Sequence, residues 1–223
     1  MNHESSCECS PYPHHIPDIA PLFENNQKWA TAILMKDPDF FLRISKEHAP
    51  EFLWIGCSDA RVPAHELIGL QPGDVFVHRN IANQVLAADM NCQSVVEYAV
   101  EVLKVKHIVV IGHYDCGGVK AAIKGGAPDM VDHWIRPIRK LYHRLQEGMQ
   151  PLDDKNRINR LVELNVIEQV KNLSQLPSVR RAWEASNLLM IHGWVYGVEN
   201  GIIKDLGVSV DSVETVHSVL HES

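Results

Sequence analysis

The sequence predicts an α/β fold in which a mostly parallel central β-sheet is flanked by helices. Four apolar runs rich in β-branched and aromatic residues are interpreted as strands, at 52–56, 74–78, 107–112 and 188–196. A helical pattern lies between the second and third runs, and strands that alternate with helices are typical of this architecture. The chain has 223 residues, of which 45% are hydrophobic. That length and composition favour one globular domain with a sizeable core.

The N-terminal region is expected to precede the sheet. Residues 1–17 are polar, rich in Pro and His and without periodicity, so we predict a flexible tail followed by a single domain over residues 18–223. Two helices are predicted next. The first covers about 20–35, and the second opens at Asp37, which suits an N-cap, with Pro38 at the first helical position.

Further helices are predicted between and after the strands. Segments 131–147 and 153–173 are expected to be helical, and "ENG" at 199–201 favours a hairpin turn into "IIKDL". The last 15 residues are expected to be peripheral. The helix after the second strand is predicted to bury one apolar stripe, formed by Cys92, Val95, Val96, Ala99, Val102 and Leu103.

The composition argues against several classes of function. A formal charge of −7 disfavours a general nucleic-acid binder, because that function needs a basic face to neutralise phosphates. No apolar run approaches the roughly 20 residues that cross a bilayer, and the N-terminus lacks the apolar core of a secretion signal. We therefore expect a cytoplasmic protein with no membrane partner. Five scattered cysteines do not resemble a disulfide framework, which leaves metal ligand, nucleophile or buried small hydrophobe.

Two of the predicted strands end in residues that bind metals. Cys57 follows the first strand, and His113 and Cys116 follow the third. The carboxyl ends of parallel strands share one edge of a sheet, so these residues can meet in one crevice. One imidazole and two thiolates suit zinc and leave a fourth position vacant, which favours a catalytic site over a structural one. Asp59 is the residue that could close the site.

These segments resemble a known family. "CSDAR" at 57–61 and "GHYDCGG" at 112–118 closely resemble the beta-class carbonic anhydrases, and the similarity extends over about residues 25–207. The resemblance implies one zinc ion per subunit, held by Cys57, His113 and Cys116, and the reversible hydration of CO2 to bicarbonate and a proton through zinc-bound hydroxide. It also implies a homodimer as the building unit, with N-terminal helices that pack on the partner subunit.

Within this resemblance, Asp59 and Arg61 form the catalytic pair. With Arg61 holding its carboxylate, Asp59 can accept a hydrogen bond from the hydroxide and orient it. Released from Arg61, Asp59 could bind zinc itself, and falling pH would favour that closed state. Val62 is predicted to line an apolar pocket for CO2, with Gly117 beside Cys116 in the same substrate pocket.

A finer resemblance concerns the type II subclass, which bicarbonate regulates. Members carry a Trp three residues before the first zinc Cys, an Arg in "HRN" and a Tyr in "HGW-x-Y"; here these are Trp54, Arg79 and Tyr196. All three side chains are hydrogen-bond donors, as an acceptor-rich anion requires. The pattern predicts a non-catalytic bicarbonate site that favours Asp59 on zinc. Resemblance to this subclass also favours a homotetramer built from two dimers.

Several alternatives stay open at the level of sequence. Zinc deaminases also use one His and two Cys, but their His-x-Glu and Pro-Cys-x-x-Cys motifs are absent. CS2 or COS could replace CO2 as the substrate on the same scaffold. A non-catalytic zinc protein closed permanently by Asp59 is the non-enzymatic rival, and a thiol redox role lacks a Cys-x-x-Cys motif. Cys92, His78 and His192 are interpreted as structural residues.

Overall fold

The computed structural model describes residues 18–220, so the tail predicted over residues 1–17 lies outside the described residues. The chain divides into two compact units, one ending at Glu47 and the other beginning at His48. Each unit is described by itself below. The expectation that residues 18–223 act as a single domain stays a prediction.

The first unit contains two helices, α1 (Ala20–Lys36) and α2 (Phe40–Lys46). The prediction for α1 is confirmed, but the predicted start of α2 is wrong. Asp39 is the N-cap residue, and Asp37 instead caps the end of α1 with its backbone N–H on the Ile33 carbonyl. The Asp37 carboxylate accepts a hydrogen bond from Arg43 Nη2 at 2.6 Å, so it is engaged by a side chain of α2 rather than by the first turn of that helix.

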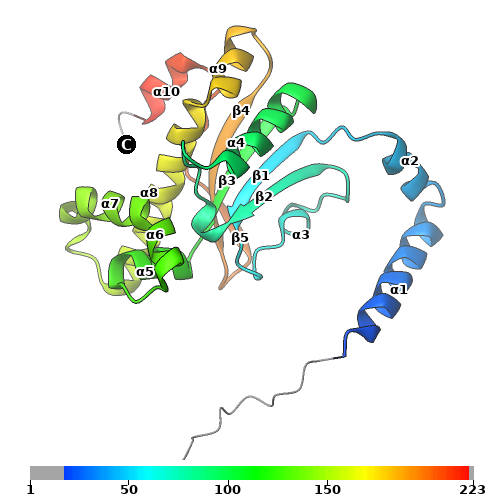
Figure 1. Ribbon diagram of the computed structural model, residues 1–223, viewed down its shortest axis with the longest axis horizontal. Coiled ribbons are helices and arrows are strands. Elements are labelled where there is room, and N and C mark those ends of the chain that lie inside the picture. Colours follow the sequence, from blue (N-terminus) through cyan, green and yellow to red (C-terminus); the bar gives the residue numbers. More distant parts are fainter. Residues whose placement is uncertain (1–17, 221–223) are drawn as a thin grey trace, which may run out of the picture. The chain divides into compact units, whose positions relative to one another are not determined.

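The second unit is built on a five-stranded sheet in the order β2-β1-β3-β4-β5 (Figure 1). The strands are β1 (Phe52–Cys57), β2 (Val75–Asn80), β3 (His107–His113), β4 (Met190–Gly197) and β5 (Ile202–Asp205). The pairs β1–β2, β1–β3 and β3–β4 are parallel, and β5 runs antiparallel to β4 after the predicted "ENG" turn. The predicted fold class, a mostly parallel sheet flanked by helices, is confirmed.

Helices connect and cover the strands. They are α3 (Ala64–Ile68), α4 (Met90–Glu97), α5 (Gly117–Lys124), α6 (Asp129–Trp134), α7 (Arg136–Leu145), α8 (Asp154–Ser174), α9 (Pro177–Glu184) and α10 (Val213–Leu220). The helix predicted over 131–147 is interrupted at Ile135, because Pro137 lies in the first turn of a new helix. The helix predicted over 153–173 matches α8 closely, and α9 was not predicted.

One part of the predicted apolar stripe is wrong. Cys92, Val96 and Ala99 are buried, but Val102 is 60% exposed and Val100 is buried in its place. A π-helical turn over Tyr98–Val102 follows α4, and its hydrogen bond from the Leu103 N–H to the Tyr98 carbonyl spans five residues. The wider turn breaks the 3.6-residue spacing on which the prediction depended.

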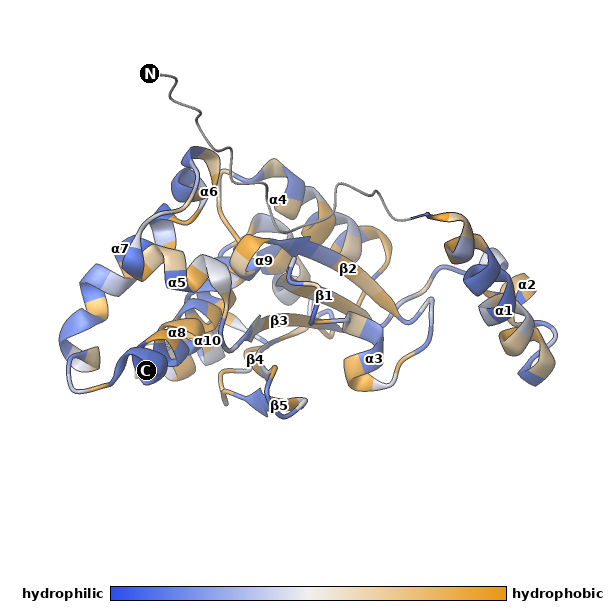
Figure 2. Ribbon diagram, turned by 90° about the horizontal axis from the view of Figure 1, so that it is seen from below, coloured by the Kyte–Doolittle hydropathy of each residue, from blue (hydrophilic) through white to orange (hydrophobic). Residues whose placement is uncertain are grey.

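The core lies on both faces of the sheet. One face of β1 and β3 packs with helices that include α4, α8 and α9, and α8 contacts β3 and β4 directly. The other face carries Trp54, Val109, Ile111 and Tyr196, and α3 is the helix of this unit whose residues pack against it. Figure 2 shows the hydrophobic colouring of β1 and β3, as expected of strands buried on both faces.

The C-terminal segment contributes to this core. Val210 pairs with Ile191 through an isolated bridge, and Val216 of α10 is buried. The prediction that the last 15 residues are peripheral is therefore wrong for the described part of that segment, because two of its valines belong to the buried core. Among the described residues, none of the helices is both long enough and apolar enough to cross a membrane.

Candidate metal centre

The direction of strand addition changes between β1 and β3. The chain places β2 on one side of β1 and then returns to place β3 on the other side. In open α/β sheets such a switch point opens a crevice beyond the carboxyl ends of the two central strands. Cys57 is the last residue of β1 and His113 the last residue of β3, so both side chains stand at this crevice.

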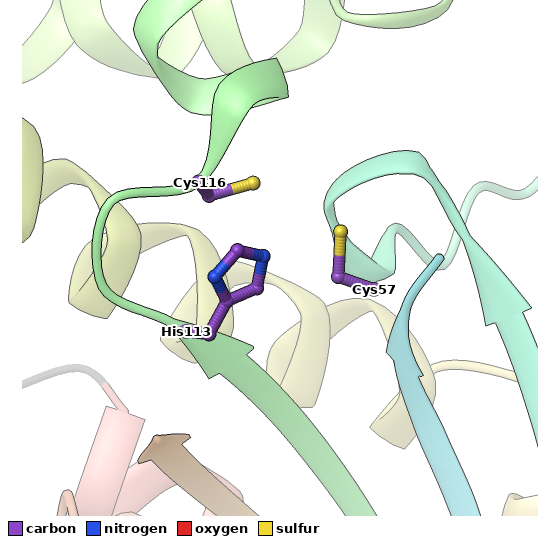
Figure 3. Close-up of side chains that lie close together, drawn as sticks. All are labelled: Cys57, His113 and Cys116. Atoms are coloured by element: carbon purple, nitrogen blue, oxygen red, sulfur yellow. The ribbon is translucent and has the colours of Figure 1, made fainter. Parts of the chain in front are cut away.

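The structure brings Cys57, His113 and Cys116 together. Their ligand atoms all lie within 4.8 Å of one another, and all three residues are buried. Figure 3 shows the two sulfur atoms and the imidazole ring converging from the ends of β1 and β3 and from the residue that precedes α5.

The imidazole of His113 is oriented for metal binding. Its Nδ1 lies 3.0 Å from the Tyr114 carbonyl oxygen and donates to it, which leaves the lone pair on Nε2. Nε2 is buried and has no hydrogen-bond partner among the described residues. A buried polar atom without a partner is unfavourable unless a ligand satisfies it. This nitrogen therefore fits a metal ion held with the two cysteines.

The two cysteines form a coupled pair. The Cys116 thiol beside the Cys57 sulfur lowers the pKa of Cys57 well below that of an ordinary thiol. The same contact with Cys57, together with burial, raises the pKa of Cys116. The Ala82 backbone N–H also donates to Cys57 Sγ, at 3.4 Å. A cation would have to displace the shared proton, and softness and charge make zinc a suitable ion for two thiolates and one imidazole.

Asp59 is held next to this cluster by Arg61. The Arg61 Nε and Nη2 atoms donate to Asp59 Oδ1 and Oδ2 at 2.9 and 2.8 Å, and the Arg61 backbone N–H adds a third bond. The hydrogen bonds from the guanidinium hold the pKa of Asp59 well below its usual range, so this carboxylate is ionised at neutral pH. Asp59 Oδ2 lies 3.6 Å from His113 Nε2, which places it at the border of the ligand cluster.

The two predicted pocket residues differ in their surroundings. Gly117 is the first residue of α5, and a Cβ added there would meet no atom within 4 Å, so space is open beside Cys116. Val62 is buried in the core on the α3 face of the sheet, in the same cluster as Ile111. Its side chain therefore forms part of the apolar packing under the site, and its contact with substrate stays a prediction.

The three residues of the predicted bicarbonate site lie on one face of the sheet. Trp54 and Tyr196 belong to the same buried cluster, and Arg79 projects to that face by strand alternation from Val75. Arg79 Nε donates to the Cys57 carbonyl at 2.8 Å, and Nη2 donates to the Asp59 carbonyl at 2.5 Å. Trp54 Nε1 is buried beneath Gly56 and has no partner among the described residues.

A second group with metal-ligand chemistry consists of His78, Asp89 and Cys92, whose ligand atoms also lie within 4.8 Å of one another. Each member has a structural explanation. Asp89 caps α4 by accepting the Asn91 N–H at 3.1 Å, and His78 Nε2 lies 3.2 Å from the Asn80 amide nitrogen. Burial raises the pKa of the Cys92 thiol to about 12 and lowers that of His78. We interpret this group as part of the core.

The sequence did not predict the side chains that hold the loop next to the candidate metal centre. The amides of Asn165, Gln169 and Asn172 on α8 bond to the loop after β2, which supplies the Ala82 N–H. Their spacing of four and three residues is visible in the sequence, but polar residues at helical spacing more often form an exposed face. Nothing in the sequence alone separates that case from a buried row.

Comparison with known proteins supports the chemistry of this centre. The family model described as carbonic anhydrase matches residues 52–203. A curated carbonic anhydrase of Emericella nidulans is 44% identical over 193 residues, which cover 86% of this chain and 85% of that protein. The chain belongs to the beta-class carbonic anhydrases. It is an enzyme, and the activity assigned to it is the hydration of CO2.

Solved structures of carbonic anhydrases agree in fold. A Coccomyxa beta-carbonic anhydrase in complex with acetazolamide is 37% identical, with a TM-score of 0.89 and coverage of 92% of this chain and 93% of that chain. One of two tetrameric beta-carbonic anhydrases of Sordaria macrospora is 41% identical, with a TM-score of 0.82 and coverage of 85% and 97%. This carbonic anhydrase therefore has the fold of its family over most of its length.

Proposed function

We propose that this carbonic anhydrase hydrates CO2 at a zinc ion held by Cys57, His113 and Cys116. The observation that carries the proposal is the buried His113 Nε2, which faces two cysteine sulfurs at the switch point of the sheet. Three protein ligands leave one tetrahedral position for a substrate-derived group. Zinc supplies a Lewis acid that lowers the pKa of a water molecule enough to provide hydroxide for attack on CO2.

The chain's own residues then orient the reaction. Arg61 occupies both oxygens of Asp59 with charge-assisted bonds, so the carboxylate stays fixed and ionised. In this position Asp59 could accept a hydrogen bond from the nucleophile that a bound zinc ion would supply, and so orient it toward the carbon of CO2. We place the substrate over Gly117, where the space is open, with Val62 contributing apolar packing beneath.

The test combines metal analysis with stopped-flow hydration of CO2. Wild-type protein is expected to contain one zinc ion per subunit and to turn over CO2. Cys116→Ser should lose both properties, because a hydroxyl is a poor zinc ligand at neutral pH. Cys92→Ser, which changes a buried cysteine of the core, should retain both. A Cys116→Ser protein with normal zinc content and turnover would exclude the proposed ligand set.

We further propose that bicarbonate and pH regulate this enzyme, as in the type II subclass. The support is the buried Trp54 Nε1 without a partner, with Arg79 and Tyr196 on the same face of the sheet. Bicarbonate bound there would compete for Arg79, whose guanidinium now donates to the carbonyls of Cys57 and Asp59. Loosening that segment would release Asp59 from Arg61 and let its carboxylate become the fourth zinc ligand.

The regulatory proposal predicts two measurements. The rate of CO2 hydration should rise steeply between about pH 7 and 9, because rising pH would favour hydroxide over the Asp59 carboxylate at the proposed metal position. Asp59 itself does not titrate in this window, since its pKa is held far below it. Replacing Trp54 with Phe, which removes the indole N–H, should abolish inhibition by added bicarbonate. A flat profile, or equal bicarbonate inhibition in both proteins, would exclude this regulation.

The assembly is proposed to be a homodimer whose N-terminal helices pack on the partner subunit, with two dimers forming a tetramer. The exposed apolar side chains of α1, which include Leu22 at 63% and Phe23 at 67%, support this proposal. Figure 2 shows hydrophobic colouring on this helix as well as hydrophilic colouring. The Sordaria macrospora relatives are described as tetrameric. The cytoplasmic location expected from the sequence stays a prediction.

A further inference from the structure

The loop after β2 has an unusual backbone. Ala82 and Asn83 are consecutive residues with positive φ angles, 62° and 48°. Side chains with a Cβ rarely adopt this conformation, and such residues persist only where surrounding contacts impose it. Both residues are buried, so solvent does not relieve the strain. The contacts that hold this loop therefore indicate what it is built to do.

Three amide side chains of α8 bond to the backbone of this loop. Asn165 Nδ2 donates to the Ala82 carbonyl at 3.0 Å, and Asn172 Nδ2 donates to the Val85 carbonyl at 3.0 Å. Between them, Gln169 Oε1 accepts the Val85 N–H at 2.8 Å. The amides also bond to one another, because Gln169 Nε2 donates to Asn165 Oδ1 and Asn172 Nδ2 donates to Gln169 Oε1.

The amide row is a costly way to fill this space. Asn165 and Gln169 are almost fully buried on a helix whose neighbouring positions are Leu161, Val162 and Val166. A buried amide is tolerated only when its hydrogen bonds are made, and an apolar side chain would pack here without that requirement. Unlike an apolar side chain, the amides fix the orientation of the peptide groups in the loop through hydrogen bonds.

The peptide group that matters is the one between Ile81 and Ala82. Its carbonyl, on Ile81, accepts a hydrogen bond from Trp134 Nε1 at 2.8 Å, and its N–H donates to Cys57 Sγ at 3.4 Å. The next peptide, between Ala82 and Asn83, is held by Asn165 through the Ala82 carbonyl. Hydrogen bonds thus hold both peptide groups that flank Ala82, and the Ala82 N–H points at the Cys57 sulfur.

We propose that Asn165, with the amide row it heads, is a positioning residue for the metal centre and acts through the Ala82 N–H on the Cys57 thiolate. The inference rests on the zinc-ligand assignment proposed above. An N–H bond to a thiolate draws electron density from the sulfur and fixes its direction. Two thiolates would otherwise neutralise a divalent zinc ion. The hydrogen bond thereby preserves positive charge on the metal, which its role as a Lewis acid requires.

The test uses cobalt(II) in place of zinc, because thiolate-to-cobalt charge transfer reports the electron density on sulfur. In Asn165→Leu, which keeps the branched shape of the side chain and removes the amide, the charge-transfer band should move to longer wavelength. Zinc affinity, measured by competition with a chelator, should fall about 10–100-fold. Asn172→Leu should give a smaller shift, since Asn172 bonds to Val85, farther along the loop from the sulfur.

Matched controls separate positioning from simple destabilisation. Leu173→Ala removes a fully buried side chain from the same helix and should lower the thermal midpoint without moving the band or the zinc affinity. Asn165→Asp provides a second variant if the leucine protein does not fold, because it still accepts from Gln169 but cannot donate to the Ala82 carbonyl.

Each outcome has a distinct meaning. An unchanged band and zinc affinity in the Asn165 variants, or an equal shift in Leu173→Ala, would overturn the positioning role. Absence of any thiolate band in the wild-type cobalt protein would instead overturn the ligand assignment. A band shift with weaker zinc binding in the Asn165 variants alone is the result that supports the inference.

Discussion

Arg61 decides which of two positions the Asp59 carboxylate takes. Its guanidinium bonds to both carboxylate oxygens, while His113 Nε2, a ligand atom of the proposed metal centre, lies 3.6 Å from Oδ2. Because the guanidinium is half exposed, solvent weakens the charge attraction, and the paired geometry of the two hydrogen bonds is the main constraint. The orientation of one carboxylate therefore depends on one neighbouring side chain.

Replacing Arg61 with Ala should lower kcat/KM for CO2 hydration by about 10–100-fold while the zinc content stays at one ion per subunit. The physical reason is that Asp59 loses the partner that, in the proposed centre, would keep its carboxylate from the metal. Stopped-flow assays and metal analysis provide the measurement. Arg43→Ala is the control, since Arg43 makes a similar pair with Asp37 in the first unit. Wild-type kcat/KM in the Arg61 variant would contradict this account.

One buried and one half-buried histidine make stability depend on pH. Burial lowers the pKa of His78 and of His192, so the folded state binds fewer protons at these sites than the unfolded state. A depressed pKa contributes full stability above the unfolded value of about 6.5, and this contribution is lost as pH falls toward the folded value. The free energy of unfolding should therefore decrease as pH falls below about 6.5.

Urea denaturation of the zinc-loaded enzyme across that range tests the prediction, with His192→Gln as the comparison. His192 bonds through Nδ1 to Ser209 and through Nε2 to His107, and an uncharged glutamine cannot titrate. The variant should lose less stability on acidification than the wild type. Zinc release affects both proteins alike, so the difference between them isolates His192. Identical pH slopes would show that this histidine does not contribute.

At the level of elements, the sequence predicts strands better than helix boundaries. Continuous apolar runs at 52–56 and 107–112 are strong signals, because a strand that is buried on both faces needs apolar residues at nearly every position. Helix ends depend on competing side-chain contacts. Asp37 has cap chemistry but pairs with Arg43, and a π-helical turn after α4 rotates Val102 to the surface.

The same contrast holds for the site, where residues at strand ends are predictable from the sequence and the contacts that support them are not. Cys57, His113 and Cys116 are identifiable because the ends of adjacent parallel strands meet, and the structure does bring them together. The contribution of Ala82 could not be predicted, since it is made by a backbone N–H and leaves no trace in residue type. Asn165 is a visible polar residue, but its burial depends on how α8 lies against the loop after β2.

The capping bond at the start of α4 tests the interpretation of the second cluster. Asp89→Ala removes the acceptor of the Asn91 N–H and should lower the free energy of unfolding by about 0.5–2 kcal/mol, measured in urea. Zinc content should remain one ion per subunit, because we assign Asp89 to the cap. Asn91→Ala leaves the cap intact and should be close to wild type. Loss of a second metal ion in the Asp89 variant would contradict the structural interpretation.

At the scale of the molecule, the apolar surface of α1 needs a partner. None of the α1 residues is buried, although Leu22, Phe23 and Trp29 are large and apolar. Isolated apolar side chains are common on surfaces, but several on one helix mark an interaction site. The α3 face of the sheet is the less covered of its two faces within the second unit, which leaves room for contacts from another subunit.

Phe23→Asp should weaken self-association at least about 10-fold, since burying a phenylalanine contributes about 1.5–3 kcal/mol and a buried charge opposes it. Size-exclusion chromatography with light scattering gives the mass as a function of concentration. Asn25→Asp introduces the same charge two residues along α1 and should associate like the wild type. An unchanged mass profile for Phe23→Asp down to nanomolar protein would rule out this surface as the interface.

The placement of the ligands on separate strands also orders events during synthesis. A ribosome releases Cys57 well before His113 and Cys116, at about 5–20 residues per second. For that interval Cys57 lacks the two residues with which it would share a cation in the proposed centre. In the proposed centre, metal capture would therefore wait for β3 to dock beside β1, and a nascent chain stalled before residue 107 would leave the Cys57 thiol exposed to oxidants.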